Sequence, residues 1–75
     1  MLPPDTYLAA TAQLETADGQ LRHYACYKHS GKYQWQDTEA QVTRSMAAAE
    51  NALADFLAQQ YAIRRLTFEW IKAKP

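Results

Sequence analysis

A run of alternating residues closed by an Asp-Gly pair limits the choice of folds more than any other feature of this chain. Apolar Leu8, Ala10, Ala12 and Leu14 alternate with side chains of mostly polar character, which predicts a half-buried strand over about residues 7–16. Asp18-Gly19 can supply the two positive φ angles of a two-residue hairpin turn. A second, antiparallel strand over about residues 20–28 is therefore expected.

The predicted turn also sets which residues face each other. A two-residue turn places Leu14 opposite His23 on one face of the sheet, and Glu15 opposite Arg22 on the other. An opposite-charge pair on an exposed face is a favourable cross-strand arrangement. The interpretation thus puts apolar side chains on one face and charged side chains on the other.

A third strand over about residues 32–36 follows a turn that contains Gly31. A three-residue loop with Gly31 in the left-handed conformation would place Tyr33 and Trp35 on the same face as Leu14. A two-residue loop would move both aromatic rings to the opposite face. The first alternative is preferred because it gathers the apolar side chains together.

The second half of the chain predicts a helix and a final strand. Thr38 followed by Gln41 has the spacing of a capping box, and apolar residues then recur every three or four positions. We expect a helix over about residues 38–60. Renewed alternation, with Leu66, Phe68 and Trp70 on one side, predicts a fourth strand over about residues 63–72.

These elements predict a single small α+β domain over residues 1–75, with a four-stranded sheet packed on one long helix in two layers. A right-handed crossover would put the fourth strand parallel to the first, in the order 3-2-1-4. The alternative is an antiparallel position beside the third strand. The expected order resembles half of a ribonuclease H-like fold, as in small antitoxins of the HicB kind. Thr11 and Gln13 stand where such a nuclease carries a metal-binding carboxylate, so the resemblance implies no nuclease activity.

Composition narrows the classes of function and location. Eight Lys and Arg residues balance eight Asp and Glu residues, so no overall field attracts nucleic acid or a membrane surface. Cys26 is the single cysteine, which excludes an intramolecular disulfide and fits a cytoplasmic location. The sequence shows neither a signal peptide nor an apolar run long enough to span a membrane.

The residues that could carry chemistry do not converge. His23, Cys26 and His29 have the types of a metal site, but on a strand residue 26 points away from residues 23 and 29. The same geometry separates the thiol from an activating histidine. We therefore expect no catalytic residues, no metal and no cofactor, and a protein that is not an enzyme.

A binding surface is the remaining interpretation. The predicted register puts basic, aromatic and polar side chains together on the open face of the sheet: Arg22, Tyr24, Lys28, Arg65 and Thr67. These five residues are the predicted contacts of a non-enzymatic protein-binding module, an inhibitor or adaptor of the phage or mobile-element type, which includes anti-CRISPR proteins. Two alternatives stay open: a small nucleic-acid-binding regulator, and a structural homo-oligomer formed through the alanine-rich helix surface or the free edge of the third strand.

Overall fold

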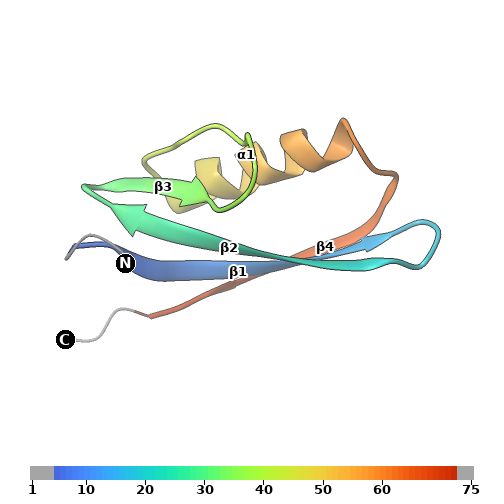
Figure 1. The fold of residues 1–75 in the computed structure, drawn as a ribbon, viewed down its shortest axis with the longest axis horizontal. Helices are drawn as coiled ribbons and strands as arrows, with labels where there is room; N and C mark the ends of the chain where they lie inside the picture. The colour runs from blue at the N-terminus through green and yellow to red at the C-terminus, as the bar shows by residue number, and fades with distance from the viewer. Residues whose placement is uncertain (1–4, 73–75) are drawn as a thin grey trace.

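Four strands and one helix make up the fold in the computed structural model, which describes residues 5–72. The elements are β1 (Tyr7–Thr16), β2 (Leu21–His29), β3 (Lys32–Trp35), α1 (Met46–Ala58) and β4 (Ile63–Trp70). The strands form one sheet in the order β3-β2-β1-β4, and α1 packs on one side of it (Figure 1). The predicted α+β class, the two layers and the order 3-2-1-4 are confirmed.

The direction of β4 differs from the prediction. β4 is antiparallel to β1, with Leu14 opposite Leu66, because a non-helical segment comes between β3 and α1. This segment runs back beside β3: the N–H of Tyr33 donates to the carbonyl of Thr43 (2.7 Å), and the N–H of Thr43 donates to the carbonyl of Tyr33 (3.1 Å). The helix then runs in the direction of β1, and β4 returns (Figure 1). The half ribonuclease H-like arrangement, which needs a parallel fourth strand, is not formed.

The helix begins eight residues later than predicted. Ser45 is its N-cap, and the Ser45 hydroxyl accepts a hydrogen bond from the N–H of Ala48 (3.1 Å). Thr38, the predicted cap, instead stabilises a turn: its hydroxyl donates to the carbonyl of Trp35 (2.9 Å) and accepts from the N–H of Ala40 (3.2 Å). The capping-box spacing of Thr38 and Gln41 thus belongs to a turn after β3 and not to a helix start. At its other end, α1 stops at Ala58 rather than near residue 60.

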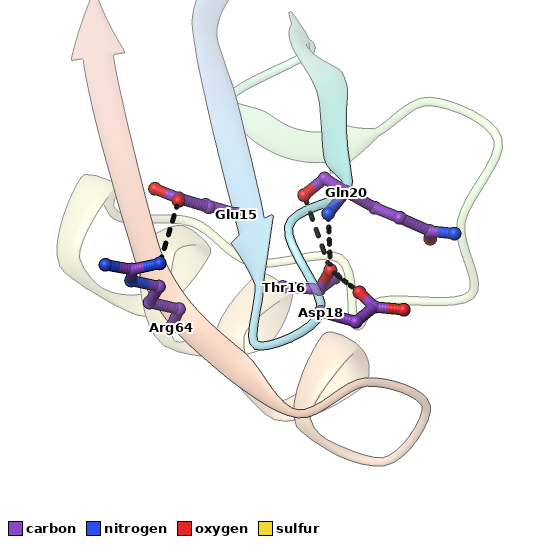
Figure 2. A network of polar contacts seen from close by, with 5 residues as sticks. All are labelled: Glu15, Thr16, Asp18, Gln20 and Arg64. Atoms are coloured by element: carbon purple, nitrogen blue, oxygen red, sulfur yellow. Dashed lines mark hydrogen bonds and ion pairs between the residues drawn. The ribbon is translucent and has the colours of Figure 1, made fainter.

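The β1–β2 hairpin has a three-residue loop, not the predicted two-residue turn. The N–H of Thr16 donates to the carbonyl of Gln20 (2.9 Å), and Gly19 takes a φ of 91° inside the loop. The Thr16 hydroxyl adds a hydrogen bond to the Asp18 carboxylate and accepts one from the N–H of Gln20 (Figure 2). The loop shifts β2 by one residue, so Glu15 faces Leu21 and not Arg22. The predicted Glu15–Arg22 pair is wrong.

The loop of the β2–β3 hairpin is one residue shorter than the preferred prediction. It has two residues, Ser30 (φ 52°) and Gly31 (φ 74°), between the paired residues His29 and Lys32. The preferred three-residue loop is therefore wrong. Each wrong loop length exchanges the two faces of the strand that follows it, and for β3 the two exchanges cancel. Tyr33 and Trp35 consequently lie on the same side as Leu14, as predicted.

The core depends on small residues in the central strand β1. Ala10 and Ala12 are buried there, which leaves room for aromatic rings from the outer strands β3 and β4 to meet over the middle of the sheet. Trp35 and Phe68 approach to 5.8 Å between ring centroids, and Tyr33 meets Trp70 edge to face at 5.5 Å. Such aromatic pairs contribute about 0.5–1.5 kcal/mol beyond the burial of their area.

The helix is joined to this core by its apolar side and by a hydrogen bond. Ala49, Leu53 and Leu57 are fully buried against the sheet. The indole N–H of Trp35, the largest buried side chain, donates to the carbonyl of Ala49 (2.8 Å). One face of the sheet is thereby covered, and no element among residues 5–72 covers the other.

Candidate binding surface

The face of the sheet opposite α1 is the main surface left without a covering element in residues 5–72. We call it the open face. Alternate residues of all four strands form it, among them Leu8, Thr11, Gln13, Leu21, His23, Ala25, Tyr27, Gln34, Arg65, Thr67 and Glu69. All of these side chains are exposed except those of Ala25 and Tyr27, which are half-buried. An extended surface of mixed chemistry is therefore presented to solvent.

The five residues predicted as contacts are divided between the two faces. Arg65 and Thr67 lie on the open face, opposite Glu15 and Gln13. Arg22, Tyr24 and Lys28 lie on the helix side, because the longer first loop shifts β2 by one residue. The expectation that all five share one face is wrong.

Arg22 and Tyr24 belong to the border of the core. The guanidinium of Arg22 lies 5.1 Å from the ring centroid of Tyr61, and its Nε donates to the Tyr24 hydroxyl (3.1 Å). The hydrogen bond to Tyr24 raises the pKa of Arg22. Tyr24 itself is half-buried and packs against the core. Their contacts thus hold the end of the sheet to the segment that follows α1.

Lys28 has a similar position at the other end of β2. Its ammonium lies 5.0 Å from the ring centroid of Tyr33, a cation–π distance. Interaction with the Tyr33 side chain raises the pKa of Lys28. Lys28 therefore covers a core aromatic ring and does not extend the open face.

Residues that the predicted register had turned inward occupy the open face instead. His23 lies opposite Gln13, and Tyr27 lies opposite Leu8. A register shift between Leu8 and Ala10 turns Leu8 away from the core, where the alternation had placed it. Leu21 is 58 % exposed. The hydroxyl of Thr16 closes the longer loop in the structure. In the sequence, however, a Thr at that position does not distinguish a three-residue loop from a two-residue turn.

The open face is hollowed by depressions, and two of them are relevant to binding. One, of about 360 Å³, lies over β2, β1 and β4 and includes polar side chains of Gln13, His23 and Thr67. The other, of about 640 Å³, lies near the β2–β3 hairpin and includes Tyr27, Gln34 and Val42. The first suits hydrogen bonding, and the second offers apolar area to a protruding side chain.

Charges of both signs surround these depressions. Glu15 forms an ion pair with Arg64 (3.6 Å, Figure 2), and Arg65 is the residue of β4 directly opposite Glu15. Nδ1 of His29 lies 2.8 Å from the carboxylate of Asp5. The open face is therefore locally polar without being basic overall.

The groups most suited to catalysis are kept apart. Cys26 is fully buried on the helix side, and burial raises the pKa of its thiol to about 11. A thiol of that pKa is protonated at neutral pH and is a weak nucleophile. His23 and His29 project from the other face. Among residues 5–72, no group of three or more His, Cys, Asp or Glu side chains is placed to hold a metal ion.

Comparisons with known proteins give no relative for this chain: no family model, no curated protein and no solved structure matches it. In the part of the chain that the structure describes, no helix is both long enough and apolar enough to cross a membrane. The functional interpretation therefore depends on the geometry of the open face.

Proposed function

We propose that this chain is a non-enzymatic protein-binding module, an inhibitor or adaptor that contacts another protein through the open face. The observation that carries the proposal is a four-stranded sheet with a helix on one side only. The other side combines exposed apolar and charged groups with the half-buried ring of Tyr27. Protein interfaces have this composition, with aromatic and Arg side chains as frequent anchors.

Apolar contacts would come from the neighbouring Leu8 and Tyr27. They face each other across β1 and β2 beside the larger depression. Leu8 is 36 % exposed, so burying the rest of its side chain in a partner contributes about 0.5–1 kcal/mol before the costs of association. Leu8 and Tyr27 are thus the proposed apolar anchors.

Polar specificity would come from Gln13, His23 and Thr67 at the smaller depression, with Arg65 beside them on β4. These side chains offer donors and acceptors that a partner must match. Of the residues predicted from the sequence, Arg65 and Thr67 remain in this contact set.

A nucleic-acid partner is the less favoured candidate. Arg65 on the open face has Glu15 and Glu69 as neighbours. A phosphate backbone attracted by Arg65 would therefore be repelled by the two adjacent carboxylates. The balanced net charge of the chain also disfavours a nucleic-acid partner. A cytoplasmic location is part of the proposal, because the single thiol of Cys26 forms no disulfide.

The experiment is affinity capture from a lysate of the natural setting, with and without nuclease, read by mass spectrometry. The test variant is His23→Ala with Arg65→Ala on the open face. The matched control is Asn51→Ala with Asp55→Ala, two exposed residues on α1. All three proteins should unfold at similar temperatures, since none of the four side chains is buried.

The proposal predicts one protein that is captured in stoichiometric amount by the wild type and the control, withstands nuclease, and is lost with the open-face variant. Recovery that disappears with nuclease would favour the nucleic-acid alternative. Loss with the helix variant alone would move the contact to α1 and refute the proposed surface.

A further inference from the structure

We propose that two copies of this chain pair through the outer edge of β4, in an antiparallel register centred on Thr67, to form a continuous eight-stranded sheet. This inference differs from the proposed contact with a different protein, although Arg65 and Thr67 take part in both. It concerns the edge of the sheet, whereas the proposed function concerns its face.

The outer edge of β4 has no partner strand within the described residues. β4 has eight residues and, within residues 5–72, pairs only with β1. The opposite end of the sheet is different, because β3 is bridged by Thr43 through two backbone hydrogen bonds. The expectation of self-association through the edge of the third strand is therefore redirected to β4. An unprotected edge strand is a template for pairing with another chain.

The backbone groups of β4 alternate between the β1 side and the outer edge. The N–H of Ile71 donates to the carbonyl of Ala9 in β1. Because alternate residues of a strand bond to alternate sides, the N–H and C=O groups of Thr67 and Glu69 also point to β1. Those of Leu66 and Phe68 then point outward, where a second β4 could bond to them.

The sequence of β4 is complementary to itself in one antiparallel register. A two-fold axis at Thr67 places Arg65 opposite Glu69 of the second copy, and Glu69 opposite its Arg65. Leu66 then faces Phe68 of the second copy, and the two Thr67 side chains face each other. Opposite charges, apolar pairs and Thr–Thr pairs are the favourable cross-strand combinations.

Neighbouring registers lose this match. A centre at Leu66 puts Arg65 opposite Thr67, and a centre at Phe68 puts Thr67 opposite Glu69. Only the centre at Thr67 pairs both charges with opposite charges. It also covers the apolar row of β4, whose members Leu66, Phe68 and Trp70 are half-buried in the single chain.

Charge reversal tests the register. In Arg65→Glu, each residue 65 faces a like-charged Glu69 of the second copy, and in Glu69→Arg each residue 69 faces a like-charged Arg65. Each single variant should form its homodimer about tenfold more weakly than the wild type. An equimolar mixture of the two should form a heterodimer, in which both charge pairs are again opposite. The double variant R65E/E69R should recover the homodimer.

Sedimentation equilibrium over a range of concentrations measures these constants, and thermal unfolding of each variant confirms that it is folded. Lys32→Glu on β3, the strand at the opposite end of the sheet order, is the matched control and should leave association unchanged. The expected wild-type species at high concentration has twice the chain mass of 8.6 kDa. A wild type that stays monomeric throughout, or a dimer with the same constant in all variants and no preference for the heterodimer, would overturn the proposal.

Discussion

Replacement of Ala12 by valine tests how the core of this sheet is built. Valine has a higher strand propensity than alanine, so propensity alone predicts a more stable protein. The structure predicts the opposite. Ala12 is 3 % exposed in the central strand and faces Tyr24 on β2 and Phe68 on β4. Its small side chain helps to leave the space in which Trp35 and Phe68 meet.

The magnitude follows from the packing. Ala12→Val adds two methyl groups to a filled site, and overpacking of this kind costs about 1–3 kcal/mol. For a domain of this size, about 2 kcal/mol corresponds to a fall of roughly 8–16 °C in Tm. The matched control is Ala25→Val on the open face, where Ala25 is half-buried and no helix packs over the added methyl groups. It should change the free energy of unfolding by less than about 0.5 kcal/mol.

The assay is thermal and urea unfolding followed by circular dichroism. An Ala12→Val protein as stable as the wild type, or more stable, would refute the reasoning that small residues in β1 are required by the aromatic pairs above them. Destabilisation of Ala25→Val to the same extent would show that the open face is also packed.

Three further predictions concern the loop, the helix and the thiol. The hydrogen bond from Thr16 lowers the pKa of Asp18 below its ordinary value of 3.8. Its stabilising effect is therefore complete above that value and lost as the pH falls through the lowered pKa, and an NMR titration of Thr16→Val should show a return toward 3.8. Ser45→Ala should cost about 1 kcal/mol in urea unfolding because it removes the N-cap, and a neutral result would contradict a helix start at Met46. Native Cys26 should react with a disulfide reagent at pH 8 only as fast as the protein unfolds, whereas immediate stoichiometric reaction would contradict its burial.

The order of the strands could be predicted from the sequence because alternation and helical spacing are strong local signals. Leu66, Phe68 and Trp70 identified β4 and its buried side without any tertiary information. The direction of β4 could not be predicted in the same way. It depends on the path of residues 36–45, where Thr38 and Gln41 have the spacing of a helix start but the chain instead runs back to bridge Tyr33 with Thr43.

The open face could be predicted only in part, because a strand exchanges its faces when its register moves by one residue. Asp18-Gly19 is compatible with loops of two or three residues, and Thr16 selects the longer one through hydrogen bonds that appear only in the folded loop. Arg65 and Thr67 were placed correctly because β4 registers independently of that loop. Arg22, Tyr24 and Lys28 were misplaced because β2 depends on it.

The register of β1 against β2 decides which residues form the proposed contact surface, and NMR measures it directly. In antiparallel sheets, the α-protons of residues paired without mutual hydrogen bonds lie close together and give strong nuclear Overhauser effects. The structure predicts such effects between Gln13 and His23 and between Thr11 and Ala25. Effects between Leu14 and His23, or between Ala12 and Ala25, would restore the two-residue turn. They would also return Tyr24 to the open face and contradict the surface proposed for binding.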